Sequence, residues 1–296
     1  MLIERTNMPK NTTDRLSALI RHFRIEAKVF PAARSGLQKE GPGDAAPNLF
    51  IFRHGRLTWP GQGMPEGGAN PPMLVFFPRG TPAGAHVEPD VNGAEYVCAA
   101  VDTVGDDNPV AQALPEVVVV RRDEVSSLQS VTDMLLEEAF SPRCGGQAVI
   151  DRLCEIAVIR LLRHLIEDGE AKVGLIAGLA HPNLSRAIVA IHDNPERNWR
   201  LEDLAGMAAM SRTHFANRFR EVVGVTPGEY LSSWRLTLAR IAIAKGASVN
   251  AAAMQTGFSC SAALSRAFTR RYGVSPRQFA KPGPTSTSEH TRNTTF

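Results

Sequence analysis

The chain has 296 residues, 43% of them hydrophobic, and a formal net charge of +3, and this length is sufficient for two domains with separate cores. It contains no run of eighteen apolar residues, and residues 1–5 lack the pattern of a secretion signal, so we expect neither a membrane helix nor export. The four cysteines form no CxxC pair, which indicates neither a zinc finger nor a disulfide framework.

The N-terminal part of the chain is predicted to be rich in β-strands. After a short helix from Asp14 to about Phe23, runs of β-branched and aromatic residues alternate with Gly, Pro, Asn and Asp. The clearest predicted strands are residues 48–52, 73–77, 95–101 and 116–120. Several short strands at close spacing predict a β-barrel or sandwich of the jelly-roll kind.

The apolar spacing becomes helical from about Ser126. It predicts one helix beginning there, a second over about residues 150–165, and a third from Leu184 to His192. The apolar stripe of residues 150–165 is more typical of a core than of an interface.

The C-terminal third contains one unit twice. Residues 211–230 are repeated in residues 260–279 at a constant offset of 49 positions. The matched pairs are Phe215 and Leu264, Phe219 and Phe268, Gly224 and Gly273, Pro227 and Pro276, and Tyr230 and Phe279. Because only two copies occur, the pattern indicates a duplicated supersecondary unit and not a repeat array.

Each unit is predicted to be a pair of short helices joined by a tight turn, which is a helix-turn-helix. The first helices are residues 201–208 and 249–256, and the second helices are residues 212–223 and 261–272. We expect Ser211 and Ser259 to cap the second helices, and Gly257 to end the first helix of the second unit. The turn of the second unit is one residue longer.

The second helix of each unit has two different faces. Its apolar face should pack inward and comprises Phe215, Phe219 and Val222 in one copy and Leu264 and Phe268 in the other. The outward side chains are Thr213, Asn217 and Arg220 in the first copy and Ala262, Arg266 and Thr269 in the second, with Ser261, Ser265 and Arg270 beside them. Either face alone could be an ordinary solvated surface, but matched positions in both copies favour contact with DNA.

A capping box follows each second helix, at residues 226–229 and 275–278. The first box begins a helix over about residues 228–245, which is roughly 27 Å long at 1.5 Å per residue. We call the second helices of the two units, residues 212–223 and 261–272, the recognition helices. We hypothesise that the helix over residues 228–245 holds them about one DNA turn apart, near 34 Å, so that they enter successive major grooves.

The charge distribution agrees with this hypothesis. Residues 191–281 contain eleven arginines and two lysines against six acids, a net charge of +7, so the rest of the chain carries about −4. No acid occurs between Gly246 and Lys281. A basic module beside a mildly acidic one is typical of a protein whose basic part contacts the phosphates of a nucleic acid.

The C-terminal motifs resemble the DNA-binding domain of AraC/XylS transcription regulators. The fixed spacings cover about residues 191–281 and include Trp199-Arg-Leu-Glu-Asp-Leu-Ala, Gly224-Val-Thr-Pro and Tyr272-Gly-Val-Ser-Pro. The resemblance implies one seven-helix domain that carries two helix-turn-helix motifs on a linker helix. The chain departs from this family at Ala252, where a larger aliphatic residue is common, and at Asn217, where arginine is common.

From these faces and this resemblance we expect specific contacts with double-stranded promoter or operator DNA. Base contacts are expected of Thr213, Asn217 and Arg266, with Ser261 and Ser265 at the edge, and phosphate contacts of Arg212, Arg218, Arg220 and Arg270. Asn217 suits adenine and Arg266 suits guanine.

The N-terminal region resembles, more loosely, the cupin-type sensor domain of one branch of the same family. The resemblance rests on Phe52-Arg-His-Gly-Arg-Leu57, Phe77-Pro-Arg-Gly80 and His86. It implies that the barrel binds a small-molecule effector or regulates the DNA-binding domain, and that the following helices form a homodimer interface.

The expected organisation is therefore mixed: a β-barrel or jelly-roll, cupin-like N-terminal domain precedes an all-α domain with two helix-turn-helix motifs. We expect a cupin-like effector domain in residues 1–125, a helical dimerisation or connector region in 126–190, the DNA-binding domain in 191–281 and a disordered tail in 282–296.

Neither a metal site nor catalytic residues are expected. His54 is isolated, His86 lies beyond the usual cupin spacing, and neighbouring acids such as Glu66, Glu88 and Glu95 form no ligand pattern. No histidine has a nucleophile at a recognised spacing and no glycine-rich phosphate loop occurs, so no enzymatic activity and no cofactor are expected. Cys144 follows an arginine, which leaves a reactive thiol as an alternative to an ordinary one.

The sequence thus predicts a bacterial, cytoplasmic transcription regulator that associates with the nucleoid when bound, with RNA polymerase as a further partner and no membrane contact. The alternative is a cupin-fold metalloenzyme or a small-molecule binding protein with a basic appendage, and this alternative requires a competent metal centre.

Overall fold

The computed structural model describes residues 14–22, 25–30, 47–61, 63–102, 114–141, 143–169 and 173–280. The chain forms two compact units. Unit 1 comprises Met1–Asp193 and Trp199–Tyr230, and unit 2 comprises Asn194–Asn198 and Leu231–Phe296. The predicted tail at residues 282–296 lies outside the described residues.

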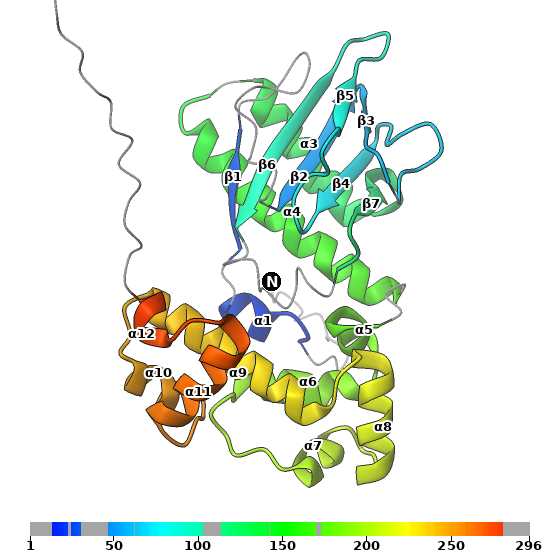
Figure 1. Ribbon diagram of the computed structural model, residues 1–296. Helices are drawn as coiled ribbons and strands as arrows, with labels where there is room; N and C mark the ends of the chain where they lie inside the picture. The colour runs from blue at the N-terminus through cyan, green and yellow to red at the C-terminus, as the bar shows by residue number, and fades with distance from the viewer. Residues whose placement is uncertain are drawn as a thin grey trace, which may run out of the picture. The chain divides into compact units, whose positions relative to one another are not determined.

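A five-stranded antiparallel sheet with the order β1-β6-β2-β4-β7 forms the N-terminal part of unit 1 (Figure 1). Its strands are β1 Glu26–Val29, β2 Asn48–His54, β4 Met73–Phe77, β6 Glu95–Asp102 and β7 Val118–Arg121. A second sheet pairs β3 Arg56–Thr58 with β5 His86–Glu88. In the central strand, Phe50 lies opposite Cys98 of β6 and Val75 of β4.

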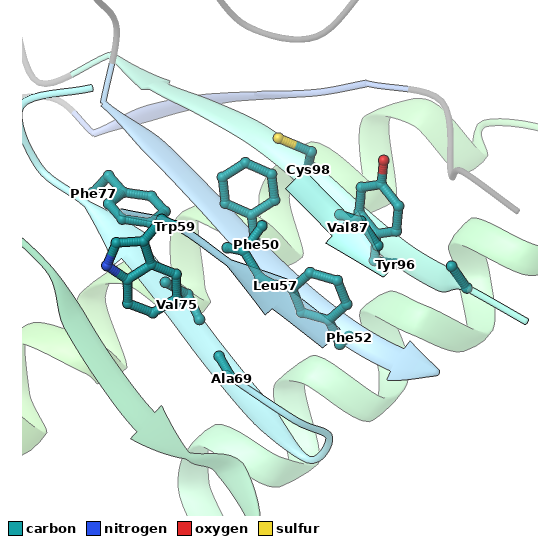
Figure 2. Close-up of a cluster of buried hydrophobic side chains, with 11 residues drawn as sticks. Phe50, Phe52, Leu57, Trp59, Ala69, Val75, Phe77, Val87, Tyr96 and Cys98 are labelled. Atoms are coloured by element: carbon teal, nitrogen blue, oxygen red, sulfur yellow. The ribbon is translucent and has the colours of Figure 1, made fainter. Parts of the chain in front are cut away.

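One face of the large sheet carries an aromatic core. Figure 2 shows the side chains of Phe50, Phe52, Phe77 and Tyr96 gathered with Trp59 over this face. The Phe52 and Tyr96 ring centroids lie 5.2 Å apart, and the Trp59 and Phe77 centroids lie 5.3 Å apart in an edge-to-face arrangement. All the buried members of this cluster are at most 8% exposed, so side chains fill the space beside the sheet.

Helices cover the opposite face of the sheet. Because successive side chains of a strand point to opposite faces, Leu49 and Ile51 of β2 lie on the face away from the aromatic core, and both are buried. Helix α3 (Ser126–Phe140) follows the short 3-10 helix η1 (Arg122–Glu124) and contacts β2 and β6, while α4 (Gly146–Asp168) packs against α3 and β1 (Figure 1). The strand-rich N-terminal domain followed by helices is therefore confirmed.

The remaining helices are one that precedes the first strand and those of the connector and the duplicated region. They are α1 Ser17–His22, α5 Leu175–Ala180, α6 Leu184–Asp193, α7 Leu201–Met207, α8 Arg212–Val223, α9 Pro227–Ala244, α10 Val249–Gln255, α11 Ser261–Tyr272 and α12 Pro276–Phe279. Both recognition helices begin and end where the sequence predicts. The division between the two units falls within α9, and the four domain boundaries stay a prediction. Within the described residues, none of the helices has the length and apolar character needed to cross a membrane.

Candidate nucleic-acid interface

The first helix-turn-helix, in unit 1, consists of α7 and α8. Ala209 adopts a left-handed conformation with a φ of 52°, and the Met210 N–H donates to the Ala205 carbonyl at 2.9 Å, which ends α7. The Ser211 side chain then accepts from the His214 N–H at 3.4 Å and caps α8, as expected. Together these contacts turn the chain within four residues.

The packing of α8 fixes which side chains face outward. Phe215 and Phe219 are fully buried with ring centroids 5.5 Å apart, as the sequence predicts. The prediction for Val222 is wrong, since Val222 is only half-buried. Val223 is the buried residue of the last turn, because it follows Phe219 at the i+4 spacing of one helix face.

The outward side of α8 carries Thr213, Asn217 and Arg220, all exposed, and we call these three residues the α8 face. Beside it, Arg212 Nη1 lies 2.6 Å from Glu202 Oε1, and Arg218 Nη1 lies 2.9 Å from Glu221 Oε2. These two predicted phosphate contacts therefore have carboxylate partners. Residues 199–230 contain four arginines and four acids, so this part has no net charge.

Arg218 also contacts a histidine outside the motif. Its Nε–H donates to His181 Nε2 at 3.3 Å. Burial lowers the pKa of His181, and the neighbouring Arg218 cation lowers it further. The neutral form of the ring is therefore favoured beside α8, and sequence spacing did not indicate this contact.

The second helix-turn-helix, in unit 2, consists of α10 and α11. The Ser248 side chain accepts from the Ala251 N–H at 3.1 Å and caps α10. At the other end Gly257 has a φ of 76°, and the Phe258 N–H donates to the Ala253 carbonyl at 2.9 Å. The predicted role of Gly257 in ending this helix is confirmed.

Gly257 also lies against another segment of unit 2. A Cβ at this position would lie 2.8 Å from the Cα and the carbonyl oxygen of Glu196. Arg235 of α9 holds the same segment by donating to the carbonyls of Pro195 at 2.6 Å and Arg197 at 2.7 Å. The turn therefore needs a residue without a side chain.

The cap of α11 differs from the prediction. Cys260, and not Ser259, is the N-cap residue, and its Sγ accepts from the Ala263 N–H at 3.4 Å. Hydrogen bonds from the backbone at the start of the helix lower the pKa of the exposed Cys260 thiol. Because the turn is one residue longer, the N-cap position falls on Cys260. Serine is the more common capping residue, but Ser259 lies one position before the N-cap.

The outward side of α11 carries Arg266, Thr269 and Arg270, which are exposed, with Ser261 and Ser265 half-buried beside them; we call these five residues the α11 face. Beneath it, Leu264 and Phe268 are fully buried, as predicted.

The sequence motifs did not indicate two further exposed arginines of unit 2: Arg271, which follows Arg270, and Arg277 in the first turn of α12. The described residues of unit 2 contain eight arginines and lysines and one glutamate, a net charge of +7. Within that described part, no ion pair forms at Arg266, Arg270 or Arg271. The positive charge of the duplicated region is thus concentrated in unit 2.

The two histidines His54 and His86 lie beside different carboxylates. His54 Nδ1 lies 3.8 Å from Asp90, and His86 Nε2 lies 3.2 Å from Glu88. Across the residues that the structure describes, no group of three or more His, Cys, Asp or Glu side chains could hold a metal ion. Cys144 is exposed, whereas burial raises the pKa of Cys154 to about 12.

Comparison with known proteins gives matches to both parts of the chain. A family model described as a helix-turn-helix domain matches residues 204–282, and one described as cupin matches residues 14–167. The transcriptional regulator MtrA of Neisseria gonorrhoeae is 30% identical over 237 residues, which are 71% of this chain and 77% of that protein. An AraC-like transcription regulator of Streptomyces antibioticus is 29% identical over 255 residues, 86% of this chain and 69% of that protein.

A shorter match is found in Haemophilus influenzae. An uncharacterized HTH-type transcriptional regulator of that organism is 31% identical over 155 residues, 52% of each chain, so the match spans about half of that relative.

Proposed function

Since the chain belongs to the AraC family of transcription regulators and carries a cupin domain before its helix-turn-helix motifs, we propose that it binds specific double-stranded DNA sequences and regulates transcription from them. The observation that carries this proposal is the pair of outward faces on α8 and α11, at equivalent positions of a duplicated unit. Exposed amide, hydroxyl and guanidinium groups on a short helix can contact base edges in the major groove.

The residues divide into two roles in this proposal. Thr213, Asn217 and Arg266 contact bases, with Ser261 and Ser265 at the edge of the contact. Arg212, Arg218, Arg220 and Arg270 contact phosphates. Arg212 and Arg218 would exchange the carboxylates of Glu202 and Glu221 for phosphate oxygens, and exposed ion pairs of this kind are weak enough to exchange.

The partners of the whole protein are part of the proposal. The two faces would occupy successive major grooves of promoter or operator DNA in the cytoplasm, where the bound protein is associated with the nucleoid. The cupin domain would bind a small-molecule effector, the helices after the sheet would form a homodimer contact, and RNA polymerase would be the partner at the promoter. No catalytic step is proposed.

A selection of bound sequences from random DNA by the full chain tests this function. We expect one enriched motif for the unaltered protein. Arg266→Ala should weaken binding to that motif by about 1–3 kcal/mol and relax the choice at one base pair. Arg270→Ala is the matched control, because loss of a phosphate contact should weaken all sequences alike. The proposal fails if no promoter fragment is preferred over random competitor DNA at physiological ionic strength.

A further inference from the structure

A cleft of about 500 Å³ lies on the helix-covered side of the large sheet. Its charged lining comprises Arg53 of β2, Arg122 of η1 and two acids of α3, Asp133 and Glu137. A volume of this size is typical of small-molecule sites. The other face of the sheet is filled by the aromatic core (Figure 2), so this cleft is the better place for a ligand of the N-terminal domain.

Arg53 forms the positive side of the cleft. Its guanidinium carbon lies over the Phe140 ring, 4.9 Å from the ring centroid, and this cation–π contact helps to hold the group in place. Nη1 lies 3.5 Å from Glu95 Oε2, a long ion pair that uses one of the five N–H donors. A planar guanidinium held in this way can bind a carboxylate through two parallel hydrogen bonds.

Asp133 and Glu137 form the negative side. They lie four residues apart on α3, where two side chains of like charge repel each other. Arg122 Nη1 donates to Asp133 Oδ1 at 2.8 Å, and Arg143 Nη2 donates to Glu137 Oε1 at 3.1 Å. Both carboxylates remain more than half exposed, so each keeps oxygen lone pairs that can accept hydrogen bonds from a ligand ammonium group.

The remaining wall is apolar and consists of Pro71, Pro72 and Leu136. Proline has no N–H to donate, so this wall offers contact mainly to a hydrocarbon group. Two cations and two anions leave the cleft without net charge. A simple anion or cation would therefore be attracted by one side of the cleft and repelled by the other. A ligand that carries both charges is attracted by both sides.

We propose that this cleft binds a small zwitterion, an amino acid with an apolar side chain. Its carboxylate pairs with Arg53, its ammonium lies between Asp133 and Glu137, and its side chain contacts Pro71, Pro72 and Leu136. This inference rests on the proposed effector-responsive function and supplies the ligand class and the site.

The position of the cleft gives a route to the DNA-binding helices of unit 1. Arg122 is only 6% exposed and binds Thr132 at 2.8 Å as well as Asp133, so it ties the end of the sheet to α3. A ligand ammonium at Asp133 competes with Arg122 for this carboxylate. Helix α3 packs on α4, α4 on α5 and α5 on α8, so a shift of α3 can reach the recognition helix through packed neighbours.

Ligand binding to the full chain without DNA tests the site. Each of the twenty amino acids is assayed by thermal shift and calorimetry beside two fragments of leucine: 4-methylpentanoate, which lacks the amine, and 3-methylbutylamine, which lacks the carboxylate. We expect at least one amino acid with an apolar side chain to bind, and both fragments to bind at least tenfold more weakly than leucine or not at all. The proposal is overturned if no such amino acid binds, or if either fragment binds as tightly as leucine.

Two variants locate the site, and a third is the control. Arg53→Gln and Glu137→Gln should each weaken amino-acid binding at least tenfold. Arg56→Gln should not, because Arg56 lies on β3 outside the cleft and pairs with Glu88. Unchanged binding by Arg53→Gln, or an equal loss in Arg56→Gln, refutes the assignment, and the melting temperature without ligand reports whether each variant folds. DNA binding is measured separately, so a chain that binds leucine but no DNA would refute the proposed function and leave the cleft assignment intact.

Discussion

The Nε2 atom of His192 lies 2.6 Å from the hydroxyl oxygen of Tyr230, and both side chains are buried. The two rings are stacked with centroids 6.0 Å apart, so this contact joins the last turn of α6 to the first turn of α9 within unit 1. The residue at the duplicated position in unit 2 is Phe279, which has no hydroxyl. The hydroxyl is thus a feature of the first copy alone, and it joins α9, the helix after that helix-turn-helix, to α6, the helix before it.

We expect Tyr230→Phe to lower the free energy of unfolding by about 1–3 kcal/mol, because it leaves a buried ring nitrogen of His192 without this partner. Chemical denaturation followed by circular dichroism measures the change. In a double-mutant cycle with His192→Phe, the combined cost should be smaller than the sum of the two single costs. Additive costs would show that the hydrogen bond contributes nothing.

The free energy of unfolding should also fall at mildly acidic pH. Burial lowers the pKa of His192 to about 3, whereas an unfolded histidine titrates near 6.5. The unfolded chain therefore binds a proton first, and stability is lost as the pH falls below about 6.5, by up to roughly 1.4 kcal/mol per pH unit. The lowered pKa of His181 acts in the same direction. Urea denaturation at pH 7.5, 6 and 5 measures this slope, which should be smaller in His192→Gln; an unchanged slope would assign the pH effect to other groups.

The duplicated region could be predicted in detail because its signals are long. Each recognition helix carries an apolar stripe over twelve residues, and two copies with the same spacing support each other. The predicted strands at 48–52, 73–77 and 95–101 are confirmed within β2, β4 and β6, and β7 begins at Val118, two residues after its predicted start. The shorter strands β1, β3 and β5 have three or four residues, too few to show a period of two.

Other features of the candidate site, such as the cap of α11 and the histidine contact of Arg218, depend on tertiary contacts that the sequence does not show. Ser259 and Cys260 are adjacent, and only the course of the longer turn determines which of them caps α11. The histidine contact of Arg218 comes from packing of α8 against its surroundings, which sequence spacing does not report. The ion pair of Arg218 with Glu221 lies within α8 at i,i+3 spacing, which the sequence does contain. The net charge of residues 191–281 also conceals a difference between the two units, because unit 2 carries nearly all of this charge.

Gly257 and Ala209 occupy the same position of the two turns, but substitution should change the free energy of unfolding at Gly257 much more than at Ala209. Gly257→Ala adds a side chain to a left-handed residue whose Cβ would lie 2.8 Å from the backbone of Glu196, so we expect a loss of at least about 1–2 kcal/mol. Ala209→Gly removes the strain of a left-handed alanine while it adds freedom to the unfolded chain, so the two effects should nearly cancel. Thermal denaturation of both variants measures the difference. Equal losses of unfolding free energy in the two variants would mean that the close approach to Glu196 does not destabilise Gly257→Ala.

The two recognition helices should differ in their share of the salt dependence of DNA binding. Each phosphate neutralised on duplex DNA contributes about 0.9 to the slope of log affinity against log salt concentration. Arg270 and Arg271 lie in a part of unit 2 whose described residues carry a net charge of +7, so the double variant Arg270→Gln/Arg271→Gln should lower the slope by up to about 2. The matched variant Arg212→Gln/Arg218→Gln also removes two arginines. The Glu202 and Glu221 carboxylates that these arginines release on binding phosphate stay beside the DNA and offset part of their charge, so the slope should change less than half as much. Fluorescence anisotropy on one DNA fragment from 50 to 300 mM salt gives both slopes. If the two double variants lower the slope equally, the carboxylates of Glu202 and Glu221 do not offset the charge of α8 when DNA is bound.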